Sequence, residues 1–140
     1  MKAFVLSSFV CLALTTAGFG RIGEDEKQIE SRYGKAAKVL GENGNVRQVG
    51  YTAGAFAVVV DFANGISQRE GFAKPDTSSL TPAEIQQILA VSAADNTTWQ
   101  ETPGKQGDRT WKRSDNKAVA IFPARGTFLV VQDANFVQPQ

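Results

Sequence analysis

Histidine is absent from the 140-residue sequence, and cysteine occurs once, as Cys11. Without histidine, catalysis by a Ser-His-Asp triad or a Cys-His pair is impossible. The usual zinc, copper and haem ligand sets are missing as well, because they depend on histidine and cysteine. Carboxylate, lysine, serine and tyrosine chemistry remains, and we expect neither a metal nor a cofactor.

The sequence also lacks a hydrophobic run long enough to cross a bilayer, which takes about 20 apolar residues. The apolar run from Ala3 to Leu14 follows the positive Lys2 and ends in the small residues Thr15 to Ala17. This order is typical of an export signal. We expect residues 1–17 to be removed, with cleavage after Gly20 as the second choice. The alternative is an N-terminal helix that remains and packs.

Loss of this signal also removes the thiol. Cys11 lies inside the signal, and Val10 stands where a lipid attachment site needs a small residue, so we expect no stable membrane anchor. An exported chain without cysteine has no disulfides and depends on its hydrophobic core. Subtracting 17 residues from 140 leaves 123, the size of one domain, which we place at 18–140. We expect the protein to be periplasmic or extracellular.

Neither sign of charge is in excess. The sequence has 15 lysine and arginine residues and 14 aspartate and glutamate residues, and removal of Lys2 leaves 14 of each. Nucleic-acid binders and proteins that bind anionic membranes carry an excess of basic residues. We therefore expect a protein or a glycan as partner and no nucleic acid, and the oligomeric state stays open.

The segment EDEKQIESRY, Glu24 to Tyr33, predicts a first helix. Ile29 and Tyr33 lie four residues apart and share one face. The acidic residues Glu24 to Glu26 fall in the first turn, where the helix dipole favours negative charge. Gly34 is a natural end of this helix. The many charges indicate a solvated helix face rather than a site.

The segment SLTPAEIQQIL predicts a second helix with clear start signals. Thr81 is a capping residue, Pro82 fits the first helical position, and Glu84 completes a capping box. Leu80 and Ile85 form the matching hydrophobic staple. One apolar stripe then faces a sheet, and it consists of Ile85, Ile88, Leu89 and Ser92.

The segment AFAVVVDF predicts a strand, because its apolar residues alternate with a period of two. Asn64-Gly65 follows and is a strong signal for a two-residue hairpin turn. ISQREGFAK is then the antiparallel partner. Counting outward from the turn pairs Val60 with Arg69 and Val59 with Glu70. The Val-rich strand is apolar on both faces, so we expect it to be central.

Four further segments read as strands, with turn residues between the last three: VRQVGYTA, RTWKRS, KAVAIF and TFLVV. The order along the chain is therefore a helix, three strands, a helix and three strands. We predict an α+β fold of two helix-then-three-strand halves, with an antiparallel sheet and the helices packed on one side.

This layout, a helix running into a meander of antiparallel strands and repeated once, resembles β-lactamase-inhibitor-like modules and small outer-membrane assembly lipoproteins. The resemblance covers Gly23 to Asp133. The mature chain lacks the cysteines of the first family and the lipid-bearing cysteine of the second. No functional residue is therefore carried over from either family.

The acidic residues are scattered along the chain and lie in no recognisable motif. This holds for Asp61, Glu70, Asp115 and Asp133. A hydrolase that uses paired carboxylates stays open as an alternative, without assigned catalytic residues. Asp61 lies between the apolar Val60 and Phe62. We expect it to be exposed near the hairpin tip, while the alternative is a partly buried acid with a raised pKa.

Aromatic and basic residues gather in KQGDRTWKRSDNK. In a strand, Trp111 and Arg113 share one face and Lys112 lies on the other. Such a strand offers a flat aromatic surface beside positive charges, which include Arg109. Arginine and tryptophan give large contact energies in a small area, so this face is a candidate binding surface, and Trp99 and Tyr51 extend it if the fold brings them near. The alternative, which we favour, is that Trp111 fills the core.

The sequence thus predicts an exported, non-catalytic binding or inhibitor-like module that acts on a protein or glycan. The predicted binding residues are Tyr51, Trp99, Arg109, Trp111, Lys112 and Arg113. One alternative is an envelope assembly or structural component that docks a partner through an edge strand or a helix. The other is the carboxylate-dependent hydrolase.

Overall fold

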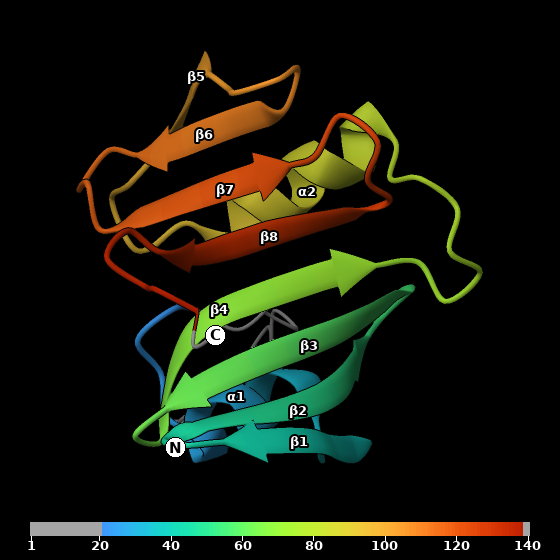
Figure 1. Cartoon of the computed structure of the whole chain (residues 1–140), viewed down its shortest axis with the longest axis vertical. Helices are drawn as coiled ribbons and strands as arrows, with labels where there is room; N and C mark the ends of the chain where they lie inside the picture. The colour runs from blue at the N-terminus through green and yellow to red at the C-terminus, as the bar shows by residue number, and fades with distance from the viewer. Residues whose placement is uncertain (1–20, 139–140) are drawn as a thin grey trace, which may run out of the picture.

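A computed structural model describes residues 21–138, so the predicted export signal and Cys11 lie outside the described part. Along the chain, a helix and four strands are followed by a second helix and four more strands (Figure 1). The fold is α+β, as the sequence predicts. The elements are α1 (Glu26–Tyr33), β1 (Lys38–Asn43), β2 (Val46–Ala53), β3 (Phe56–Ala63), β4 (Ile66–Ala73), α2 (Pro82–Ser92), β5 (Trp99–Pro103), β6 (Arg109–Arg113), β7 (Ala118–Phe122) and β8 (Phe128–Asp133).

All eight strands form one antiparallel sheet in the order β1-β2-β3-β4-β8-β7-β6-β5. Each half contributes a meander, and the last strands of the two meanders, β4 and β8, pair with each other. Gly71 lies opposite Val130 in this central pair. The two halves therefore share a single sheet, in which β1 and β5 are the edges.

The expectation of three strands in each half is wrong, because β1 and β5 were not predicted. Both are edge strands with largely exposed residues. Every residue of β1 is exposed, and β5 carries the polar sequence WQETP. A strand without a buried face shows no alternation of apolar and polar residues, which is the pattern that identifies strands in a sequence.

The helix boundaries follow the predicted capping residues closely. The Thr81 side chain accepts a hydrogen bond from the Glu84 backbone N–H, and the Glu84 carboxylate accepts one from the Thr81 backbone N–H. Pro82 is at the first helical position. The helix α1 begins two residues later than expected, at Glu26, because Asp25 caps it in the same reciprocal way with Gln28. Gly34 ends α1 with φ of 87°, a conformation that glycine adopts without strain. The stripe predicted for α2 is buried: Ile85, Ile88, Leu89 and Ser92.

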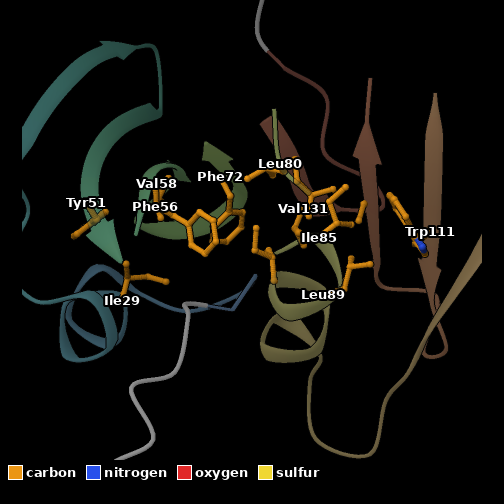
Figure 2. Packing of buried hydrophobic residues seen from close by; sticks show 14 of the residues in the cluster. Ile29, Tyr51, Phe56, Val58, Phe72, Leu80, Ile85, Leu89, Trp111 and Val131 are labelled. Atoms are coloured by element: carbon orange, nitrogen blue, oxygen red, sulfur yellow. The ribbon is translucent and has the colours of Figure 1, made fainter. Parts of the chain in front are cut away.

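One cluster of buried hydrophobic side chains connects both halves of the chain. Figure 2 shows it running from Ile29 and Tyr51 at one end, through Phe72 and Val131, to Trp111 at the other. Full burial of one such side chain contributes roughly 1.5–3 kcal/mol. The described part of the chain contains no cysteine, so this core has to hold the fold without disulfides.

The hairpin between β3 and β4 turns at Asn64-Gly65, as predicted, but its register is not the one counted from the turn. A β-bulge next to Asp61 shifts the pairing by one residue. Asp61 therefore lies opposite Arg69, and Val60 lies opposite Glu70. Since neighbouring residues of a strand point to opposite faces, the bulge moves Glu70 to the buried face and Arg69 to the other.

Candidate functional site

The predicted aromatic and basic surface is not an exposed surface in the fold. Trp111 is only 3% exposed and belongs to the hydrophobic core, the position that the favoured alternative assigns to it. Arg113, on the same face of β6, is 5% exposed and donates a hydrogen bond of 2.9 Å from Nε to Oδ1 of Asp115. This hydrogen bond lowers the pKa of the Asp115 carboxyl below its usual value. The Trp111 side chain therefore packs in the core and does not form an exposed binding surface.

The remaining predicted residues of this surface are divided between two faces and two halves of the sheet. The Arg109 guanidinium lies 4.9 Å from the centre of the Trp111 ring and binds Glu101. Trp99, partly buried, lies opposite Arg113 in the register of β5 and β6. The strand alternation places Lys112 on the opposite face, where it is exposed. Tyr51 is buried in β2, in the other half of the chain.

The face that carries Lys112 continues across the sheet as a second set of side chains, which we call the Val59 face. Val59 in β3 alternates with the buried residues Val58 and Val60 and therefore points away from the core. The register then fixes its neighbours on the same face. In strands β2, β3, β4 and β8 they include Gln48, Gly50 and Thr52 of β2, Ala57 and Asp61 of β3, Arg69, Gly71 and Ala73 of β4, and Phe128, Val130 and Gln132 of β8.

A hollow of about 270 Å³ lies in the middle of the Val59 face. Its floor is the backbone at Gly71, where an added Cβ would meet no atom closer than the Val59 carbonyl oxygen at 4.0 Å. Phe128 and Val59 stand at its sides and are 40% and 36% exposed. The absence of a side chain at Gly71 therefore creates the hollow. The lining residues are Gln48, Ala57, Val59, Asp61, Arg69, Gly71, Ala73, Phe128 and Val130.

One end of this hollow is polar. Asp61 is 2% exposed, which corrects the expectation of an exposed acid near the hairpin tip. Its Oδ2 lies 3.4 Å from Nη1 of Arg69, and the same nitrogen donates to Oε1 of Gln138 at 3.3 Å. Gln48 lies directly opposite Asp61 in the neighbouring strand. An ion pair flanked by amide groups therefore closes an otherwise apolar hollow.

A second hollow of about 270 Å³ lies on the other side of Asp61, toward the β1 edge. It shares Gln48 and Asp61 with the first hollow, and Gln138, which accepts a hydrogen bond from Arg69, lines this second hollow alone. The rest of its lining comes from β1 and the start of β2, including Asn43. Polar groups thus separate the apolar hollow from the edge of the sheet.

Glu70 is the one acidic side chain inside the described hydrophobic core. It is fully buried, and its Oε2 accepts a hydrogen bond of 3.1 Å from the Tyr33 hydroxyl. Burial raises the pKa of Glu70 to about 8. Asp61, the other buried acid, lies on the opposite face of the sheet. These two carboxylates cannot flank one substrate, as a glycosidase mechanism requires.

Between residues 21 and 138, no group of at least three acidic, histidine or cysteine side chains is arranged to hold a metal ion. Neither helix of this part has the length and apolar character needed to cross a membrane.

Comparison with known proteins gives no family for this chain. No protein-family model matches it, and neither the curated proteins nor the solved structures include a significant match. The function therefore has to be argued from the side chains and hollows of the fold itself.

Proposed function

We propose that the chain is an exported, non-catalytic binding module that holds a protein partner on the Val59 face. In this proposal both helices cover the opposite face of the sheet. Ile29 of α1 and Ile88 of α2 belong to one core cluster with Phe72 of β4, which supports this arrangement. In the view of Figure 1 the strands lie in front of both helices. Neither helix of residues 21–138 then covers the Val59 face, which can meet a partner.

The observation that carries the proposal is the apolar hollow over Gly71. The solvent side of an antiparallel sheet is usually polar, whereas this hollow is walled mainly by Val59, Phe128 and Val130. Exposed apolar surface of this kind is typical of interaction sites, and a pocket that accepts one anchoring side chain is typical of protein interfaces. Its volume of about 270 Å³ lies below the roughly 300–1,000 Å³ of small-molecule pockets. A protein side chain is therefore the better fit.

The test adds a side chain to the floor of the hollow. Gly71→Val fills the hollow without a backbone clash, because an added Cβ has open space. Gly50→Val is the matched control: Gly50 flanks Val59 on the other side in the same row, and its added Cβ meets only ordinary contacts at 3.6 Å and beyond. We expect crosslinking capture from the native envelope to yield a partner with the wild type and Gly50→Val and to lose it with Gly71→Val. Equal capture by both variants would refute the proposal.

The assembly-component alternative has one observation in its favour, the exposed edge strand β1. Val39 and Leu40 of this strand are 44% and 48% exposed, and an edge strand offers free backbone groups to a partner strand. Docking through the apolar stripe of α2 is not supported, because Ile85 and Leu89 are buried. Capture that is lost with Leu40→Lys and kept with Gly71→Val would favour this alternative.

A further inference from the structure

The polar end of the hollow restricts which side chain of a partner can fill it, and the argument rests on the proposed function. Ala57, Val59 and Ala73 of the lining are apolar, and they match an apolar group. Asp61 and Arg69 at the end are a carboxylate and a guanidinium. A purely apolar side chain would remove the exposed part of the Arg69 guanidinium from water without replacing the hydrogen bonds that it loses, which is unfavourable.

The charge balance of this end excludes a charged tip. Asp61 and Arg69 neutralise each other, and Asp61 is nearly inaccessible to water. A buried ammonium or carboxylate from a partner would leave one charge without a counterpart, and an uncompensated buried charge is strongly unfavourable. A neutral tip that donates and accepts hydrogen bonds has no such penalty.

Room for a neutral tip exists because the present hydrogen bonds are long. The Arg69 nitrogen lies 3.4 Å from the Asp61 oxygen and 3.3 Å from that of Gln138, whereas charge-assisted bonds of this type are usually about 2.7–2.9 Å. A carboxylate offers about four lone-pair positions and a guanidinium five donors. Both residues line the hollow, and Arg69, whose side chain is 26% exposed, is the more accessible of the two to a ligand.

We propose that the hollow receives a tyrosine side chain of the partner protein. The aromatic ring lies over the bare backbone at Gly71, between Val59 and Phe128. The hydroxyl donates to Asp61 and accepts from Arg69. Tyrosine combines an apolar body with such a tip, while phenylalanine lacks the tip and the indole of tryptophan donates but does not accept.

The experiment is an NMR titration of the purified, isotope-labelled protein with two probes, N-acetyl-tyrosine amide and N-acetyl-phenylalanine amide. We expect the tyrosine probe to shift the backbone amide signals of Val59, Gly71 and Phe128 and to bind about tenfold more tightly than the phenylalanine probe, because its hydroxyl bonds to charged groups. Equal affinities would overturn the tyrosine assignment. If neither probe shifts the backbone amide signal of Gly71, the tyrosine assignment is overturned as well.

Three variants locate the effect. Gly71→Val should abolish binding of both probes, and Gly50→Val should leave both unchanged, because Gly50 does not line the hollow. Asp61→Leu, which has a similar size but accepts no hydrogen bond, should remove the preference for tyrosine while phenylalanine binding persists, and the comparison of probes on the wild type remains decisive if this variant is unstable. If Asp61→Leu leaves the preference intact, the hydroxyl does not bind at Asp61 and the assignment fails.

A third probe, 4-methylphenol, and an extended tyrosine-containing peptide distinguish a protein side chain from a free phenol. We expect the peptide to bind more tightly, since it adds contacts along the Val59 face, and tighter binding of the free phenol would overturn the protein source. The proposed function is judged separately by the capture experiment. If Gly71→Val still captures the partner, that function fails, whereas equal probe affinities alone remove only the tyrosine.

Discussion

Replacement of Glu70 by glutamine should remove a large part of the pH dependence of folding stability. Glu70 is fully buried in β4, where its register partners on both sides are the apolar Val60 and Val131. The Tyr33 hydroxyl bonds to one carboxyl oxygen, but among the described residues Oε1 has no hydrogen-bond partner. The groups facing it are thus Tyr33 and, farther off, Arg32 and Glu24. Burial dominates and favours the neutral acid.

The direction of the effect follows from the raised pKa. The pKa is about 8 in the folded protein against an ordinary value of 4.5, so the folded state retains a proton that the unfolded state releases. The stability from this group is fully present below pH 4.5 and is lost as the pH rises toward about 8. The slope is about 1.4 kcal/mol for each pH unit, which gives at most about 5 kcal/mol over the whole window.

The assay is urea unfolding followed by tryptophan fluorescence, for the wild type and Glu70→Gln. Glutamine has the size of the protonated acid and still accepts the Tyr33 hydrogen bond, so the two proteins should be similar near pH 5. Toward pH 8 the variant should become the more stable one, by at most about 4 kcal/mol. Glu42→Gln is the control, because the Glu42 side chain is 69% exposed, and it should change stability by about 0.5 kcal/mol or less at every pH.

A stability difference between the wild type and Glu70→Gln that stays constant from about pH 5 to pH 8 would refute the reasoning. It would mean that Glu70 ionises in the folded protein as readily as in the unfolded chain. The burial of the carboxyl against α1 and the core would then not determine its protonation.

Three further substitutions test the account of the fold. Thr81→Ala removes the cap of α2 and should lower the free energy of unfolding by about 1 kcal/mol in urea; an unchanged midpoint would mean that the capping box contributes nothing. Trp111→Ala should cost about 3–5 kcal/mol, because this side chain belongs to the core, and thermal unfolding with near-wild-type stability would return Trp111 to the list of surface residues. Asp115→Ala leaves the buried Arg113 without its carboxylate partner and should lower the free energy of unfolding in urea by about 2 kcal/mol. Asp115→Asn should restore part of this loss. A loss below about 0.5 kcal/mol with Asp115→Ala would show that the ion pair is not needed for stability.

Much of the local structure could be predicted because its signals lie within a few residues. The reciprocal capping of Thr81 and Glu84 and the turn at Asn64-Gly65 both depend on short-range hydrogen bonds and backbone conformations, and both are present. The edge strands β1 and β5 could not be found, since neither has a buried face. The bulge at Asp61 has no sequence signal either, and it reverses the faces of Arg69 and Glu70.

The candidate site depends on pairings that the sequence does not encode locally. Gly71 of β4 and Phe128 of β8 lie in the two halves of the chain and meet only through the pairing of these strands. Local composition instead indicated Trp111 and Arg113, which lie close together in the sequence but point into the fold. A glycine in the middle of the strand ISQREGFA was the one available sign, because such a glycine often marks a close approach of a ligand or backbone.

Site-specific photocrosslinking can show whether a partner binds in the hollow over Gly71. A benzophenone side chain replaces Phe128 at the wall of the hollow or Lys112 on the same face of the distant strand β6. We expect a crosslinked partner from position 128, lost when Gly71→Val is added, and little or none from position 112. Equal crosslinking from both positions, or crosslinking from 128 that Gly71→Val does not reduce, would contradict the claim.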